Sequence, residues 1–185
     1  MKVGVLGAGT WGTALAVQLA SNGHEVMLWS ALAKEIDALA ADRNRIPNLP
    51  GASLPESVKL TKELSEACTG KELLVFAVSS KFVRSVAVQV KPYISKGQKI
   101  VNVGKGIEEE TLMTLTQVIA QENPEASVAV LSGPSHAEEV SRGIPTAIVV
   151  GSAEPETALF VQDAFMKKKK QGKNTQSWYY LLPKN

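Results

Sequence analysis

The sequence predicts an α/β fold in which helices cover both faces of a doubly wound, mostly parallel sheet. Two observations lead to this prediction. Short apolar runs typical of buried strands alternate with helix-like segments along most of the 185 residues. Several of these runs end in glycine or serine, which is typical of the ligand-facing edge of such sheets. The length suits one well-buried domain and a short remainder.

The first predicted strand runs into a glycine-rich turn. Residues 3–6 are mostly apolar, Gly7, Gly9 and Gly12 follow with the spacing G-x-G-x-x-G, and a helical pattern begins without a gap. In this context Gly7 permits the tight turn, Gly9 lets the backbone approach a pyrophosphate, and Gly12 lets the helix pack on the strand. The free N–H groups and the dipole at the helix start attract the anion. The pattern predicts a Rossmann-like domain that binds NAD or NADP.

The second predicted strand covers residues 24–30 and follows a helix stop at Asn22-Gly23. At the end of this strand an acidic residue would bind the ribose 2′-hydroxyl of NAD, or an arginine the 2′-phosphate of NADP. The sequence offers neither there. Ser30 and Lys34 could contact a phosphate, although Lys34 also fits a solvent-exposed charge on a helix. The choice between the two cofactors is therefore left open.

The remaining predicted elements follow in alternation. Helices are expected over 32–41, 61–68, 81–93, 110–121 and 155–166, with another starting at His136. Strands are expected over 58–60, 72–78, 99–103, 126–131 and 145–151, and an irregular, proline-rich excursion covers 44–55. Because strands and helices alternate, right-handed crossovers should make the strands parallel.

Two of these strand ends carry candidate site residues. Ser79 and Ser80 follow the fourth strand, where they either contact the nicotinamide half of the cofactor or only cap the next helix. Lys105 stands between Gly104 and Gly106 after the fifth strand. A surface lysine needs no such close backbone approach, so the position fits a cation held against an anion or a polarised oxygen.

The sixth strand ends in Ser-Gly-Pro-Ser-His-Ala-Glu-Glu over residues 132–139. Small residues and a hydroxyl at this edge suggest a backbone-lined pocket next to Lys105. His136 could act as a general base, because an imidazole ordinarily titrates near neutral pH. A structural role at the start of a helix is the alternative for this histidine.

Composition argues against several other classes of protein. The net charge of +2 rests on six lysines after Met166, and the chain before them is mildly acidic, so no nucleic-acid groove is indicated. No apolar run approaches the ~20 residues of a membrane span. We therefore expect a soluble, cytoplasmic protein with a small-molecule substrate. The single cysteine, Cys68, excludes an internal disulfide and fits a small buried helix residue, and we expect no metal site.

Three motifs in register give the chain a family resemblance. GAGTWGTAL over 7–15, GKGIE over 104–108 and SGPSHAEE over 132–139 resemble the bacterial NAD(P)+-dependent glycerol-3-phosphate dehydrogenases. The resemblance runs from Met1 to about Met166. It implies reduction of dihydroxyacetone phosphate to sn-glycerol 3-phosphate with NADH or NADPH, the start of glycerophospholipid synthesis.

The resemblance also assigns roles to individual residues. Lys105 would contact both cofactor and substrate, and its charge would stabilise the oxyanion that develops when a carbonyl accepts a hydride. The other positions are Thr10 and Trp11 at the cofactor diphosphate, Ala137 against the cofactor, and Gly133 and Ser135 at the substrate. For full-length family members the resemblance allows a homodimer.

Three departures from the family pattern accompany this resemblance. Ser79 replaces a common proline, and the second strand lacks the arginine often seen there, which weakens the case for NADP. After Met166 the family continues into an all-helical domain whose G-G-A-L-K-N motif supplies the proton-donating lysine. This chain instead has a lysine-rich, aromatic tail over 167–185, which we expect to be disordered. We interpret the tail as the product of a shifted reading frame, with a natural extension as the alternative.

The sequence therefore predicts a dinucleotide-binding domain over residues 1–166, without the helical domain of the family. We expect weak cofactor binding and little or no turnover. Two alternatives stand beside this interpretation. One is another NAD(P)-dependent dehydrogenase of similar fold, such as a ketopantoate reductase. The other is a non-catalytic nucleotide-sensing module that signals through its tail.

Overall fold

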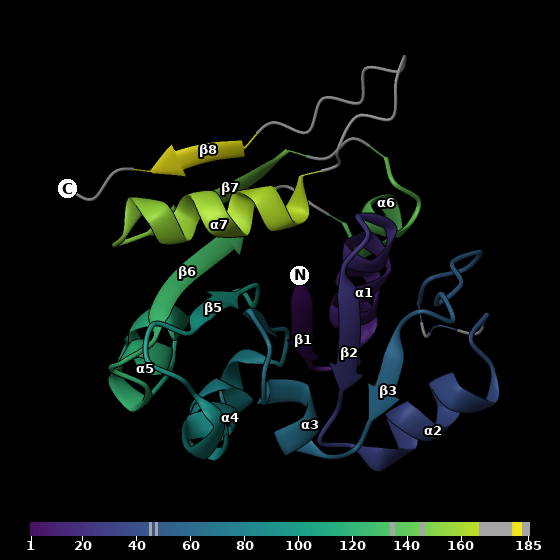
Figure 1. The fold of residues 1–185 in the computed structure, drawn as a ribbon, viewed down its shortest axis with the longest axis horizontal. Coiled ribbons are helices and arrows are strands. Elements are labelled where there is room, and N and C mark those ends of the chain that lie inside the picture. The colour runs from purple at the N-terminus through teal and green to yellow at the C-terminus, as the bar shows by residue number, and fades with distance from the viewer. Residues whose placement is uncertain (45, 47, 134–135, 145–146, 167–178, 183–185) are drawn as a thin grey trace.

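The computed structural model describes all residues except 45, 47, 134–135, 145–146, 167–178 and 183–185. Its described strands form one sheet (Figure 1). They are β1 (Lys2–Leu6), β2 (Glu25–Trp29), β3 (Lys59–Thr61), β4 (Leu73–Phe76), β5 (Lys99–Asn102), β6 (Ser127–Ser132), β7 (Ile148–Ser152) and β8 (Tyr179–Leu182). The strand order is β3-β2-β1-β4-β5-β6-β7-β8, so it reverses direction between β1 and β4. The predicted doubly wound architecture is confirmed.

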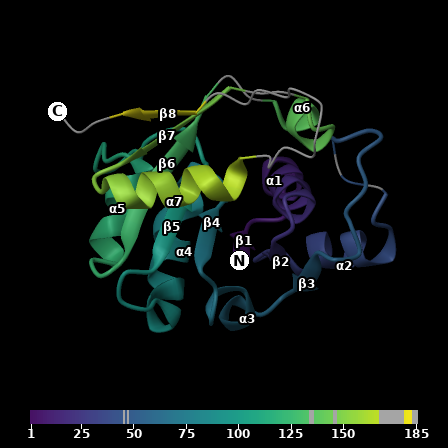
Figure 2. The same cartoon turned by 45° about the horizontal axis from the view of Figure 1, so that its top comes forward.

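The helices cover both faces of the sheet (Figure 2). They are α1 (Thr10–Ser21), α2 (Ala33–Ala41), α3 (Leu64–Cys68), α4 (Val83–Val90), α5 (Leu115–Glu122), α6 (Ala137–Ser141) and α7 (Pro155–Phe165). Short 3₁₀ turns, η1 (Ser80–Phe82) and η2 (Lys91–Tyr93), flank α4. One face packs against α1 and α7, with α6 lying on α1, and the other packs against α3, α4 and α5. No helix in the described part of the chain is both long and apolar enough to cross a bilayer.

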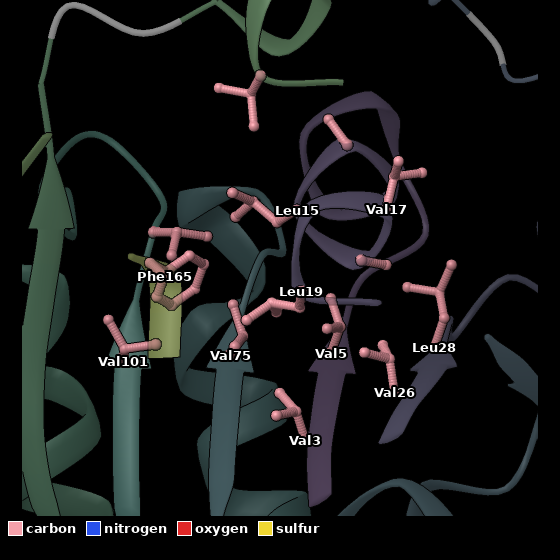
Figure 3. Close-up of a cluster of buried hydrophobic side chains, with 14 of the residues drawn as sticks. Val3, Val5, Leu15, Val17, Leu19, Val26, Leu28, Val75, Val101 and Phe165 are labelled. Atoms are coloured by element: carbon pink, nitrogen blue, oxygen red, sulfur yellow. The ribbon is translucent and has the colours of Figure 1, made fainter. Parts of the chain in front are cut away.

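The hydrophobic core between α1 and the sheet explains why the central strands consist of apolar residues. Val5 and Val75 are fully buried, and Leu19 of α1 lies over them (Figure 3). Phe165, at the end of α7, is also fully buried and lies over Val101 of β5. A strand buried on both faces needs apolar side chains at successive positions, which is the pattern that the sequence shows.

The prediction of a parallel last strand is wrong for β7. β7 pairs antiparallel with β6, with Val149 opposite Ser132. The reason is the short helix α6, which packs on α1 and does not carry the chain back to the amino ends of the strands. The chain therefore enters β7 from the edge at which β6 ends.

β8 runs parallel to β7 and continues the sheet at its edge. The sequence predicts a disordered tail over 167–185, whereas Tyr179–Leu182 form a strand in the structure. The physical reason is that an edge strand offers unpaired backbone groups, and Tyr-Tyr-Leu-Leu favours pairing with them. The other residues of the predicted tail, 167–178 and 183–185, lie outside the described residues.

Several predicted helices have different limits in the structure, and the one predicted over 61–68 begins at Leu64 because Thr61 belongs to β3. The helix predicted over 110–121 begins only at Leu115, because a turn closed by a bridge between Ile107 and Thr114 precedes it. Thr114 then starts the helix with a capping box. Ser80 does not cap a helix as predicted, because it lies inside η1, and no side-chain cap bond starts η1 or α4.

Cys68 is fully buried on α3, as the sequence predicts. Burial raises the pKa of its thiol to about 12. The thiol therefore stays protonated near neutral pH, and since the thiolate is the reactive form, this cysteine is chemically inert in the folded protein.

Candidate functional site

A cleft of about 480 Å³ opens at the carboxyl edge of the sheet, above the point where the strand order reverses. Ligands of open α/β sheets bind at this topological switch point. The start of α1, the segments after β4 and β5, and the start of α6 line the cleft. The described lining residues are Thr10, Trp11, Ala77, Val78, Ser79, Ser80, Val103, Gly104, Lys105, His136 and Ala137.

Two of the motif glycines are required by packing. Gly7 has φ +122°, and a Cβ there would lie 2.7 Å from the Ala77 carbonyl oxygen. A Cβ on Gly12 would lie 1.9 Å from the carbonyl oxygen of Gly7. Real atoms do not approach so closely, so both positions exclude any side chain. These contacts bring the β1–α1 turn against the end of β4.

Gly9 differs from its two neighbours in the motif. Its backbone is extended, with φ −69° and ψ 179°, which any residue can adopt. A Cβ at this position would have no atom of the described chain within 4 Å. Packing therefore gives no reason for glycine here, whereas a ligand lying against the backbone does.

The start of α1 suits an anion. Gly9 is the N-cap residue, so no side chain caps the helix, and its first turn contains no acidic residue. The N–H groups at such a helix start, together with the helix dipole, attract negative charge. Thr10 and Trp11 lie here and line the cleft, which fits the predicted position of a cofactor diphosphate.

The loop that carries Lys105 is held at its first residues. Asn102, only 2% exposed, donates from Nδ2 to the Gly104 carbonyl at 2.9 Å and accepts the Gly104 N–H at 3.3 Å. The Trp11 indole N–H donates to the Val103 carbonyl at 3.1 Å and ties α1 to the same loop. Lys105 itself is exposed and faces the cleft from a backbone fixed on both sides of it.

Arg84 holds the far end of this loop. It donates two hydrogen bonds of 2.7 Å to Glu108 and further bonds to Glu122 and Gln121 on α5. Thr111 donates a hydrogen bond to the same Glu108 carboxylate at 2.6 Å. The hydrogen bonds from Arg84, followed by that from Thr111, lower the pKa of Glu108 from 4.5 to about 2. The carboxylate therefore stays charged across the physiological pH range.

The cleft brings together seven of the residues that the sequence singled out. Lys105 faces the same space as Thr10 and Trp11, and the remaining members are Ser79, Ser80, His136 and Ala137. His136 precedes α6 without a side-chain cap bond, so its predicted roles both stay predictions.

Besides Lys105, two further residues are predicted at the substrate, Gly133 and Ser135, and the structure does not place them in the cleft. Gly133 is not among the lining residues described, and a Cβ on it would lie 2.6 Å from the Ala147 carbonyl oxygen, so packing alone requires glycine there. Ser135 lies outside the described residues. Their roles at the substrate stay predictions.

Sequence reasoning missed three residues at this edge. Asn102 had a signal, since a polar residue in an apolar strand needs a hydrogen-bond partner. Arg84 had none, because its partner Glu108 is distant in the sequence. Glu35 was missed at the end of β2, where the first turn of α2 brings its carboxylate within 2.5 Å of the Ser30 hydroxyl.

The fold and the cleft together define the class of protein. A glycine turn between β1 and α1, with an open helix start at the switch point, is the architecture of a Rossmann-type dinucleotide-binding domain. The comparison with known families is more specific. The family model described as the N-terminus of NAD-dependent glycerol-3-phosphate dehydrogenase matches residues 2–158, and the chain belongs to this oxidoreductase family, whose cofactor is NAD or NADP. The family match decides against the ketopantoate reductase alternative.

Individual relatives agree with this assignment. The chain is 50% identical over 165 residues to a glycerol-3-phosphate dehydrogenase [NAD(P)+] of Agathobacter rectalis, covering 89% of this chain and 49% of the relative. It is 50% identical over 173 residues to one of Lactobacillus delbrueckii, covering 90% and 51%. The crystal structure of the Coxiella burnetii glycerol-3-phosphate dehydrogenase matches with a TM-score of 0.83 at 29% identity, covering 100% of this chain and 54% of that one. The chain spans about half the length of the curated relatives it matches.

Substitutions of Gly9 and Gly12 should have different effects, one on ligand binding and the other on stability. Gly9→Ala should change the free energy of unfolding by no more than about 1 kcal/mol, because its Cβ meets open space. It should weaken NADH binding about tenfold or more, since the Cβ occupies space meant for the ligand. Gly12→Ala should destabilise by more than about 2 kcal/mol through its backbone clash. Urea unfolding and calorimetric titration measure both effects. Unchanged NADH affinity in a folded Gly9→Ala variant would count against the site.

The low pKa of Glu108 predicts a pH-dependent contribution to stability. The pKa is about 2 in the folded state against an ordinary 4.5, so the charged group stabilises the folded state above about pH 4.5, and this stabilisation is lost as the pH falls toward 2. Wild type should therefore exceed Glu108→Gln in unfolding free energy near neutral pH, and the difference should shrink in acid. Urea unfolding at several pH values tests this, and a difference independent of pH would contradict it.

Proposed function

We propose that this chain forms the cofactor-binding half of an enzyme that reduces dihydroxyacetone phosphate to sn-glycerol 3-phosphate with NADH or NADPH. The observation that supports this most is the position of Lys105 in the same cleft as the open start of α1. The Lys105 ammonium group and the start of α1 would then both face the cofactor and substrate bound in this cleft. The reaction would feed glycerophospholipid synthesis, and a cytoplasmic location and a homodimer stay predictions.

The residues present fit a dinucleotide. Gly9 leaves room for a ligand at the helix start, and the N–H groups of α1 would hold the diphosphate. Ser79 and Ser80 line the cleft after β4 and would lie toward the nicotinamide half. When bound, the reduced cofactor supplies the hydride.

Lys105 would act on the substrate carbonyl. As the carbonyl carbon gains a hydride, negative charge develops on the oxygen, and a nearby ammonium group stabilises that charge. The restraints from Asn102, Trp11 and Arg84 keep the lysine's backbone in place, so little reorganisation is needed. Gly133 and Ser135 would complete the substrate site.

The alkoxide oxygen must then receive a proton. The family resemblance gives this task to the lysine of a G-G-A-L-K-N motif, which does not occur in these 185 residues. We therefore propose that the 185-residue polypeptide by itself binds dinucleotide but reduces little substrate.

A chimaera tests this proposal. Joining residues 1–166 to the remaining length of the Agathobacter rectalis relative should give an enzyme that oxidises NADH or NADPH when dihydroxyacetone phosphate is added. Lys105→Met in the chimaera should lower kcat about 100-fold, because the oxyanion loses its cation. Lys81→Met is the matched control, since Lys81 is near the same edge but outside the described lining of the cleft, and it should have little effect.

Two outcomes would contradict the proposal. One is a folded chimaera that binds the dinucleotide but does not reduce dihydroxyacetone phosphate. The other is full turnover by the 185-residue polypeptide alone, which would show that the proton has another source.

A further inference from the structure

The end of β2 presents a carboxylate in a fixed position. Ser30 follows β2 directly, is only 5% exposed, and donates its hydroxyl hydrogen to Glu35 Oε2 at 2.5 Å. The same hydroxyl accepts the N–H of Leu32 at 3.1 Å. Glu35 belongs to the first turn of α2, so the helix carries it back to the strand end from which the chain came.

The strand end to which this carboxylate is hydrogen-bonded lies beside the glycine turn. Trp29 pairs with Leu6 across the β1–β2 ladder, and its carbonyl accepts the N–H of Gly7 at 2.8 Å. Ser30, the first residue after β2, is therefore level with the start of the turn over residues 7–12, which follows the neighbouring strand β1. In Rossmann-type domains the adenosine ribose of the cofactor lies over the end of this second strand.

We infer that Glu35, oriented by Ser30, makes this chain select NADH over NADPH. A carboxylate with one oxygen engaged by Ser30 still has acceptor capacity for the ribose 2′-hydroxyl. It repels a 2′-phosphate, which carries nearly two negative charges at neutral pH. Residues 30–36 contain no arginine that would attract the 2′-phosphate. Their one basic residue, Lys34, is the neighbour of Glu35 in the sequence. The inference rests on the cofactor binding proposed above.

The same hydrogen-bond pattern occurs once more at the next strand. Thr61, the last residue of β3, donates to Glu66 Oε2 at 2.6 Å and accepts the N–H of Glu63 at 3.0 Å. The pattern by itself is therefore a way of starting a helix after a strand. What distinguishes Glu35 is its place, because β2 neighbours β1 and its glycine turn, whereas β3 does not. Glu66 thus provides a matched control.

The test measures the affinities of NADH and NADPH for the 185-residue chain by calorimetric titration. Wild type should bind NADH more tightly. Glu35→Gln keeps an oxygen for the Ser30 hydroxyl but removes the charge, and it should lower the ratio of the NADPH Kd to the NADH Kd about tenfold. Glu66→Gln should leave this ratio unchanged.

Each other outcome overturns the inference. If Glu35→Gln weakens the binding of NADH and NADPH equally, Glu35 has only a structural role. If Glu66→Gln changes the ratio of the two Kd values as much as Glu35→Gln does, the position of Glu35 next to β1 is not what sets the preference. A wild type that prefers NADPH would also contradict it. If neither dinucleotide binds wild type, the proposed function fails as well. If both bind and the ratio does not respond to Glu35→Gln, only this inference fails.

Discussion

The close approach of the first turn to the fourth strand is the constraint on which the rest of the structure depends. Gly12 lies so near the carbonyl of Gly7, and Gly7 so near that of Ala77, that no side chain fits at either glycine. This approach presses α1 onto the sheet and fixes its start above the reversal of strand order. The anion-attracting end of a helix and the carboxyl ends of β4 and β5 are thereby brought to one cleft.

The opposite wall of the cleft is built differently, from hydrogen bonds and not from close packing. Asn102, Trp11 and Arg84 restrain the loop on either side of Lys105, while the lysine itself stays exposed. An exposed side chain on a restrained backbone can turn toward a ligand without a change of fold. The chain thus combines a closely packed helix start with an exposed lysine on a hydrogen-bonded loop.

Sequence reasoning predicted what depends on local pattern. Buried strands, the glycine turn and the helix begun by Pro155 follow from composition and periodicity over short windows. The antiparallel direction of β7 could not be predicted, because it depends on where α6 packs. The pair of Arg84 and Glu108 joins distant segments and leaves no local signal. Glu35 was not predicted because it follows Ser30 by five residues, and only the first turn of α2 brings its carboxylate back to the end of β2.

The decisive experiment is to map where a dinucleotide binds on the folded chain. Backbone amide resonances of the 185-residue chain would be followed by NMR during titration with NADH. We expect the largest saturable shifts at residues 9–12 and 104–106, on the two walls of the cleft. Shifts centred instead on the groove between α5 and β6, or the absence of saturable shifts in a folded chain, would contradict it.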